Sequence, residues 1–299
     1  MVKIFIRILI LSFLIQAHEI VAQELDEDVQ VVLLAGQSNM AGGGNYDKLS
    51  DSIKERVDCV SHRVSLSFNG KKATPLSYYK NKPSKKYKFK RRFGPELLMG
   101  VCLAEKYPDK TFLLIKRSQG GTSLYGAWNP KWSAEKAKQL EKGTFKQNLK
   151  LYQLHIKDIE RNLEELRTKK LSYQVVGLTW MQGENDAAKE VAAKSYKKNL
   201  RKLIVSYKRD LGLSKLPFVA GQTNSRYGDF EGGPEMVRAA IEKVANSDYY
   251  SDYIATKNDI PWDDYPKHSD NVHYNSEGQV RLGTKFAEKI IDLNQKTKR

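Results

Sequence analysis

A serine follows the apolar run at 29–35, within Gly36 to Met40 (Gly-Gln-Ser-Asn-Met). In an open α/β sheet, residues just past the carboxyl end of a strand face the ligand crevice, and neighbouring glycines let a substrate approach closely. A hydroxyl there becomes a nucleophile when a base takes its proton. Since an isolated serine behind a strand is more often a helix cap, Ser38 needs partners elsewhere in the chain.

The segment Asp270 to His273 supplies such partners near the other end of the chain. A histidine can remove the serine proton, while a carboxylate orients the histidine and stabilises its protonated form. Asp270 and His273 are three residues apart and can meet within one turn. His268 is the main rival base, and its place in the same loop favours a supporting role. Ser38, Asp270 and His273 together indicate acyl-transfer chemistry.

Two middle segments could stabilise the oxyanion that such chemistry produces. Ser118 to Thr122 contains two glycines, and a glycine amide can point into a crevice without a Cβ in the way. Trp180 to Asp186 contains Gln182 and Asn185, whose side-chain amides can donate hydrogen bonds. Each segment taken alone is also typical of a tight turn between a strand and a helix. All these segments lie at predicted strand ends, which favours one common site.

The elements that position these residues follow from the apolar pattern. Short apolar runs bounded by turn residues predict buried parallel strands at 29–35, 112–115, 175–180 and 217–220. Helical periodicity covers 95–106, 149–166, 187–210 and 234–246, and Ser276 can cap a last helix. This alternation predicts a three-layer α/β/α sandwich on a mostly parallel sheet. Without a repeat or a linker, residues 23–299 are expected to form a single domain.

The first 22 residues are expected to be an export signal. Lys3 and Arg7 precede an apolar run at 8–15, which is well short of the roughly 18 apolar residues that cross a bilayer. We therefore expect a periplasmic or extracellular mature chain with no membrane span. The composition of the full chain of 299 residues, 40% hydrophobic and 29% charged, excludes a disordered or collagen-like class.

The two cysteines, Cys59 and Cys102, have neither C-x-x-C spacing nor the spacing of Cys/His metal ligands. We expect no redox motif and no structural zinc. Cys102 lies on the apolar face of a predicted helix, and nothing in the sequence brings Cys59 near it. This favours two buried thiols over a disulfide.

A basic insertion is predicted at about residues 70–92. Its run from Lys80 to Arg92 has eight Lys or Arg residues and no acidic residue, within a chain whose formal net charge is +16. The simpler interpretation is an exposed segment with solvated charges. The alternative is the wall of a groove for an anionic polymer, in which interleaved aromatic residues offer stacking faces.

Five segments together resemble the sialate O-acetylesterase domain of the SGNH hydrolase superfamily, the group that includes the carbohydrate esterase family 6 acetylxylan esterases. They are 36–40, 94–96, 120–123, 180–186 and 270–273. The resemblance covers nearly the whole mature chain. It implies a flavodoxin-like α/β/α fold and a serine esterase that uses no metal and no cofactor. The implied reaction is the removal of O-acetyl groups from carbohydrate.

The resemblance also implies roles for single residues. Ser38 would be the nucleophile and His273 the base, and Asp270 would orient the histidine. Glu184 is the alternative acid that the resemblance implies, because some relatives use the glutamate of this block. Asp270 is favoured, since its place in the sequence guarantees a short reach to His273.

The implied oxyanion hole consists of the amides of Ser38 and Gly121 and the side chain of Gln182. The chain departs here from the wider superfamily, which usually has an asparagine where Gln182 stands. Three further polar side chains in these segments are expected to bind substrate or support the hole: Gln37, Asn39 and Asn185.

The expected partner is an acetylated oligo- or polysaccharide. A noncatalytic polysaccharide-binding protein on the same fold is the alternative, with tyrosines and tryptophans as sugar platforms. Nucleic-acid binding is disfavoured, because an export signal separates the chain from most nucleic acid. A lipase would need an apolar acyl groove, whereas these loops carry Gly, Asn, Gln and Trp. The sequence leaves the sugar and the oligomeric state open.

Overall fold

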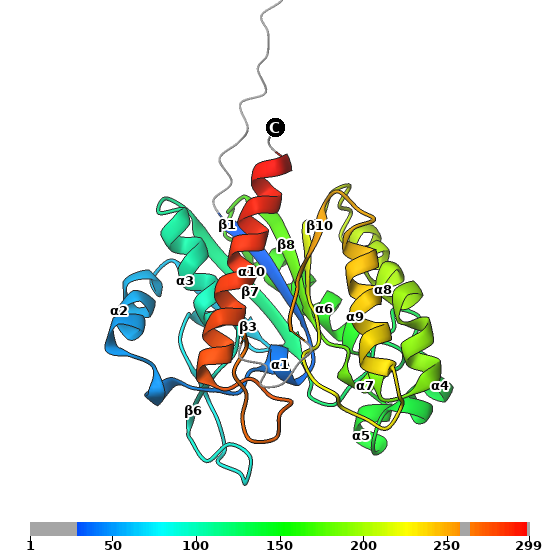
Figure 1. The fold of residues 1–299 in the computed structure, drawn as a ribbon. Coiled ribbons are helices and arrows are strands. Elements are labelled where there is room, and N and C mark those ends of the chain that lie inside the picture. Colours follow the sequence, from blue (N-terminus) through cyan, green and yellow to red (C-terminus); the bar gives the residue numbers. More distant parts are fainter. Residues whose placement is uncertain (1–28, 258–263, 298–299) are drawn as a thin grey trace, which may run out of the picture.

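The structure is a computed structural model that describes residues 29–257 and 264–297. The predicted export signal lies outside the described residues. A seven-stranded sheet with the order β10-β9-β8-β1-β7-β3-β4 crosses the centre of the molecule (Figure 1). Its strands are β1 (Val29–Gly36), β3 (Val64–Phe68), β4 (Thr74–Pro75), β7 (Thr111–Ser118), β8 (Tyr173–Met181), β9 (Phe218–Gly221) and β10 (Ser251–Ile254). Every pairing is parallel except that of β3 with β4.

Helices cover both faces of the sheet and form the outer layers. The helices on one face are α6 (Leu151–Thr168), α8 (Glu190–Asp210) and α9 (Gly233–Ala245). Those on the other face are α2 (Asp51–Val60), α3 (Glu96–Lys106) and α10 (Ser276–Thr297). Successive residues of β1 point to opposite faces, so Val31 and Leu33 pack in one core while Val32 and Leu34 pack in the other. The predicted three-layer sandwich is confirmed.

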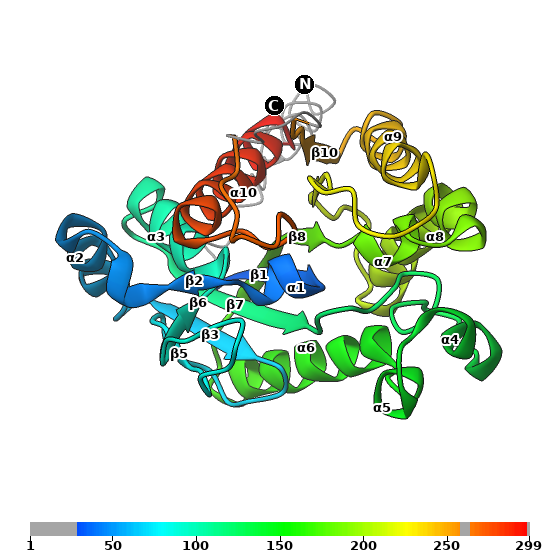
Figure 2. The ribbon, with the colours of Figure 1, turned by 60° about the horizontal axis from the view of Figure 1, so that its bottom comes forward.

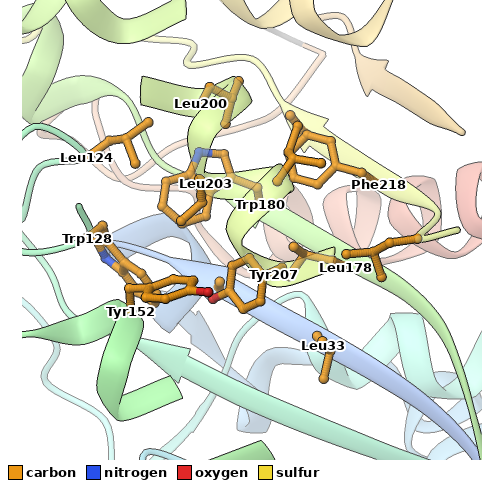
Figure 3. Close-up of a cluster of buried hydrophobic side chains, with 14 of the residues drawn as sticks. Leu33, Leu124, Trp128, Tyr152, Leu178, Trp180, Leu200, Leu203, Tyr207 and Phe218 are labelled. Carbon is orange, nitrogen blue, oxygen red and sulfur yellow. The ribbon is translucent and has the colours of Figure 1, made fainter. Parts of the chain in front are cut away.

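The core on the α6 and α8 side is rich in large aromatic residues (Figure 3). Trp128 and Trp180 are fully buried and meet edge to face, with ring centroids 5.2 Å apart. The Trp180 indole also donates a hydrogen bond of 3.0 Å to the hydroxyl of Tyr196, which satisfies its buried N–H. This packing fixes the end of β8, from which the segment with Gln182 and Glu184 continues.

The central strands end at the same level. Gly36, the last residue of β1, pairs with Ser118 of β7 and with Met181 of β8. The segments that follow these three strands therefore begin side by side, on the edge of the sheet where α1 (Ser38–Ala41) and α7 (Glu184–Ala187) lie (Figure 2). The predicted strand ends of β1, β7 and β8 therefore meet at one edge of the sheet.

The predicted strands and helices correspond to β1, β7, β8, β9, α3, α6, α8, α9 and α10. The predicted helix at 187–210 is divided into α7 and α8, because residues 188 and 189 leave the helical path. The proposed cap of α10 is wrong: the Asn275 side chain accepts a 3.1 Å hydrogen bond from the Gly278 amide, while the Ser276 hydroxyl donates to Asn45. Two short helices, α4 (Ala134–Leu140) and α5 (Thr144–Gln147), lie between β7 and α6.

The basic insertion, together with residues 44 and 45, forms a small antiparallel sheet that the sequence did not predict. Its strands, in spatial order, are β2 (Gly44–Asn45), β6 (Arg91–Phe93) and β5 (Tyr79–Lys80). Most of its lysines are exposed, as the simpler interpretation expects. Arg92 differs, since its guanidinium donates to the carbonyl of Gly42, four residues after Ser38. The insertion is thus attached to the loop that carries the serine.

The two cysteines are free, and no disulfide forms. The expectation that both thiols are buried is only partly met. Cys102 is half-buried and contacts Thr284 of α10, but Cys59 is exposed near the end of α2. The apolar neighbours of Cys102 belong to a core-facing helix, whereas α2 buries only Val57 and Val60.

Candidate active site

Ser38 is the first residue of the short helix α1, directly above the end of β1. The turn that leads to it is held closely against β8. The Gln37 amide donates a 3.0 Å hydrogen bond to the Met181 carbonyl, and a Cβ at position 36 would lie only 2.1 Å from that same oxygen. Only glycine fits at position 36, so the serine is presented on a sharply defined turn.

A cavity of about 250 Å³ opens beside Ser38. Its walls come from segments that are far apart in the sequence, and both Ser38 and His273 line it. The complete lining is Gln37, Ser38, Lys86, Gly120, Gly121, Glu184, Asn185, Tyr227, Val272 and His273. Of the predicted site residues, the structure therefore brings the serine, the histidine and Gly121 together around one space.

Asp270 and His273 form the predicted pair. Nδ1 of His273 lies 2.8 Å from Oδ2 of Asp270, and the backbone amides of Val272 and His273 donate to Oδ1 at 3.0 and 2.9 Å. A ring bound to the carboxylate through Nδ1 keeps Nε2 for another partner. This is the orientation that a histidine base requires next to a serine.

The environment of this pair suits its charges. Partial burial alone would raise the pKa of Asp270, but the hydrogen bonds from the His273 amide, the Val272 amide and the His273 ring outweigh it and hold the pKa well below its usual range. Burial lowers the pKa of His273, the positive charge of Lys86 lowers it further, and Asp270 only partly opposes them. The histidine is therefore neutral at pH 7 and able to accept a proton.

Glu184, the alternative acid, has different partners. Its two carboxylate oxygens accept hydrogen bonds from the side-chain amides of Gln37 and Asn39, the second at 2.9 Å. Burial raises its pKa, although these hydrogen bonds lower it in part. None of the hydrogen bonds in the described part of the chain joins Glu184 to His273. Its geometry is that of a residue that positions the two neighbours of Ser38.

Asn39 connects the serine segment to the histidine loop. Its Nδ2 donates to the Val272 carbonyl at 3.0 Å, and its Oδ1 accepts from the Tyr274 amide at 3.0 Å. Both partners are direct neighbours of His273, so the carboxamide fixes the height of the histidine loop above α1. His268 also supports this loop through its backbone, since its amide donates to the His273 carbonyl at 2.8 Å.

Gly120 and Gly121 form another part of the cavity wall. A Cβ at position 120 would stand 3.4 Å from Cβ of Ser38, which shows how closely this backbone passes the serine. Gly121 has a φ of +66°, a conformation that favours glycine, and its carbonyl accepts a 3.2 Å hydrogen bond from Nζ of Lys146. The backbone at this turn can therefore approach a bound substrate.

Gln182 is not placed to donate to an oxyanion. It is fully buried, and its Nε2 donates to the Thr122 carbonyl at 3.1 Å and to Asp186 at 2.6 Å. Both hydrogens of the amide are thus in use, and the predicted contribution of Gln182 to the hole does not fit this geometry. The residue lies in a buried network that holds the turn before α7.

Asn185 lies on the cavity wall, three residues further along the same turn. Its neighbour Asp186 is buried and accepts hydrogen bonds from the amides of Leu124 and Tyr125, at 2.8 and 2.9 Å. Burial raises the pKa of Asp186 to about 7 despite these bonds. The turn is therefore anchored by Asp186, and Asn185 is the residue of this segment with a carboxamide at the cavity.

Lys86 is a residue of the site that the sequence did not indicate. It lines the cavity, and its Nζ lies 2.7 Å from Nδ1 of His273 and 3.5 Å from Oδ2 of Asp270. In the sequence it is one of several lysines in the basic insertion, and nothing in its local pattern distinguishes it. Contacts between residues that are 187 positions apart have no local signal.

The described residues contain neither a cluster of metal ligands nor a helix that could span a membrane. Within residues 29–257 and 264–297, no group of three or more His, Cys, Asp or Glu side chains is arranged to hold a metal ion. Over the same ranges, no helix is both long enough and apolar enough to cross a membrane.

Comparisons with known proteins identify the class to which this α/β/α protein belongs. The family model of carbohydrate esterases described as sialic acid-specific acetylesterases matches residues 28–292. The chain belongs to this family. A curated relative from Arabidopsis thaliana, described as a probable carbohydrate esterase, is 23% identical over 274 residues, which are 88% of this chain and 90% of that protein.

Solved structures show the same fold. The Arabidopsis thaliana protein superimposes with a TM-score of 0.62 at 20% identity, covering 89% of this chain and 98% of its own. NanS gives 0.60 at 17% identity, covering 90% and 99%. A carbohydrate acetylesterase from Xanthomonas citri gives 0.57 at 17% identity, covering 89% of this chain and 56% of its own. The predicted family and fold are confirmed.

Proposed function

We propose that this protein is a serine-dependent carbohydrate O-acetylesterase. The observation that carries the proposal is that Ser38 and His273 line one cavity, while Asp270 holds the histidine ring at 2.8 Å. Family membership supports the esterase class. The mechanism, the acetyl group and the sugar are inferences from the site.

The reaction proceeds as acyl transfer in two halves. His273 takes the proton of Ser38 as the hydroxyl oxygen attacks the acetyl carbonyl carbon, and the imidazolium is stabilised by Asp270. The tetrahedral intermediate collapses with breakage of the bond to the sugar oxygen, which receives the proton from His273. A water molecule then attacks the acetyl-enzyme in the same way, releasing acetate and returning the proton to Ser38.

The negative oxygen of the intermediate needs preorganised donors. We assign this role to the backbone amides of Ser38 and Gly121 and to the side-chain amide of Asn185. Asn185 replaces Gln182 in the assignment because it lines the cavity, whereas both hydrogens of the Gln182 amide are used in the buried network. An asparagine at the cavity can offer its N–H without that competition.

The cavity favours a small acyl group. A volume of about 250 Å³ lies below the usual range of roughly 300 to 1,000 Å³ for ligand pockets, and it must also admit part of the sugar. Its lining is mostly polar or glycine, which suits a hydroxylated substrate rather than a fatty acyl chain. We also retain export from the cell as part of the proposal, on the sequence of the first 22 residues.

Acetate release from a panel of acetylated glycans tests the function, with Ser38→Ala as the matched blank. Acetylated xylan, acetylated pectin fragments and O-acetyl sialic acids form the panel. We expect release from at least one glycan by the wild type and a loss of at least about 10³-fold with Ser38→Ala. Wild-type rates equal to those of Ser38→Ala on every glycan would overturn the proposal, and glycan binding without turnover would identify the noncatalytic alternative.

A further inference from the structure

The tip of the basic insertion places a lysine in the candidate active site. Lys86 is the only lysine or arginine among the described residues that line the cavity. About 40% of its side chain is exposed, so a ligand in the cavity can reach the ammonium group.

The backbone that carries Lys86 is held in place. At the tip, the amide of Ser84 donates to the Tyr87 carbonyl at 2.9 Å, and the Tyr87 amide donates to Oγ of Ser84 at 3.1 Å. The buried Tyr87 ring packs against the guanidinium of Arg92, 4.3 Å from the ring centroid, and against His268 of the histidine loop. The position of Lys86 therefore follows from its anchored neighbour and not from an unattached loop.

Lys86 shares the partners of the proposed base. The ammonium group of a lysine has donors only, and so does a protonated Nδ1 of histidine. Both lie within reach of Oδ2 of Asp270, at 3.5 and 2.8 Å, and they are 2.7 Å from each other. The positive charge next to His273 opposes the formation of the imidazolium. An anionic partner on the cavity side would draw Lys86 away from this pair.

Glu184 is the only Asp or Glu among the described residues that line the cavity, and both of its oxygens accept hydrogen bonds from Gln37 and Asn39. Asp270 does not belong to this lining, and its carboxylate is paired with His273 and lies 3.5 Å from Nζ of Lys86. A second lysine, Lys146, donates to the carbonyl of Gly121, another residue of the lining, at 3.2 Å. Two lysines thus place positive charge in or next to the cavity.

We propose that Lys86 is a specificity-determining residue that selects acetylated sugars carrying a carboxylate close to the ester. The inference rests on the proposed esterase function and adds the substrate class. The sugar carboxylate pairs with Nζ of Lys86, and this pairing removes the lysine from Asp270 and His273. An anionic substrate therefore gains both a binding contact and a more effective base, whereas a neutral sugar gains neither.

The test compares acetylated galacturonate oligosaccharides with the same compounds after methyl esterification of their carboxyl groups. The acetyl esters are identical in both, so the ratio of the two kcat/KM values isolates the effect of the carboxylate. We expect the wild type to favour the carboxylate form by about tenfold, the size of a partly exposed charged hydrogen bond. Lys86→Met should reduce the ratio to near one, and Lys86→Arg should retain most of it.

Lys85→Met is the matched control, because it removes the same charge from an adjacent exposed lysine that does not line the cavity. We expect its ratio to equal that of the wild type. A wild-type ratio near one, a ratio unchanged by Lys86→Met, or an equal loss with Lys85→Met would overturn the assignment of Lys86. These results differ from failure of the esterase function, in which neither form releases acetate faster than with Ser38→Ala.

Discussion

Nδ2 of Asn39 lies 2.9 Å from Oε1 of Glu184, and this contact joins the residue after the candidate nucleophile to the turn behind β8. The other oxygen of the same carboxyl group accepts the side-chain amide of Gln37. Both oxygens of Glu184 thus accept hydrogen bonds from the two neighbours of Ser38. The carboxylate that contacts the histidine is Asp270, which agrees with the preference drawn from the sequence.

This division of roles predicts different effects for two isosteric substitutions. Asp270→Asn should lower kcat by about 10⁴-fold, as in a serine enzyme whose histidine loses its orienting carboxylate, and it should leave the fold intact. Glu184→Gln should instead lower the free energy of unfolding by about 1 to 3 kcal/mol, because its new amide group faces the amides of Gln37 and Asn39. Acetate release and urea unfolding of both variants provide the comparison. A larger loss of kcat in Glu184→Gln than in Asp270→Asn would reverse the assignment.

The oxyanion assignment predicts a contrast between two residues of one turn. Asn185→Ala should lower kcat by about 10² to 10³-fold with little change in unfolding, because a donor to the transition state is lost. Gln182→Ala should chiefly destabilise the protein, since Asp186 and the Thr122 carbonyl lose a buried donor. Rates should be measured at a temperature at which both variants are folded. If Asn185→Ala retains the wild-type kcat, Asn185 is not a donor to the oxyanion.

The pH dependence of kcat/KM should report the state of His273. The base must be neutral, and burial together with the charge of Lys86 lowers its pKa from 6.5 despite the opposing effect of Asp270. Activity should therefore persist below pH 6.5 and decline only when the histidine becomes protonated at lower pH. Lys86→Met removes one of the two main causes of the lowered His273 pKa, namely the positive charge. The decline of kcat/KM in acid should therefore move to higher pH. A decline that stays in place would show that Lys86 does not act on the base.

A histidine outside the site should control stability in acid. His155 is fully buried between the Tyr207 hydroxyl, 2.7 Å away, and the Ile115 carbonyl, and burial lowers its pKa to about 3. In the unfolded chain this histidine binds a proton as the pH falls below about 6.5, whereas in the folded chain it stays neutral. The free energy of unfolding is therefore highest above that pH and decreases below it by about 1.4 kcal/mol per pH unit. His155→Gln should therefore lose about 2 kcal/mol less than the wild type between pH 7 and pH 5 in urea unfolding.

The matched control for this comparison is His62→Gln, which changes an exposed histidine. Its unfolding free energy should decrease between pH 7 and pH 5 by the same amount as that of the wild type. An identical decrease in His155→Gln and the wild type would mean that His155 is not the group responsible.

Much of the fold could be predicted because its signals are local. The continuous apolar runs of β1, β7 and β8 identify buried parallel strands, and the periodicity of α6 and α8 identifies amphipathic helices. The small sheet could not be predicted in this way. Its strands β2 and β5 have two residues each, too few to show a period, and they form only by pairing with β6.

In the candidate site, too, contacts between residues close in sequence could be predicted, whereas contacts between distant residues could not. Asp270 and His273 are close in sequence, and their contact could be anticipated. The direction of Gln182 could not, because it depends on the turn at Gly183 and on buried partners that lie 60 positions away, such as Thr122. The place of Lys86 depends on how the insertion folds back over the loop of His273. Such contacts follow from the tertiary structure and not from any pattern of neighbouring residues.

The tip at residues 84–87 is joined to the rest of the molecule through the short strands β5 and β6, which lie outside the seven-stranded sheet. Tyr87 anchors this tip to Arg92 and His268, whereas residues 84–86 are exposed. Exchange of residues 84–86 would therefore leave Ser38, its turn and the main sheet as they are. Laboratory redesign, or divergence between related genes, can thus alter the choice of acetylated sugar by changing a few neighbouring residues. The nucleophile and the turn that carries it stay the same.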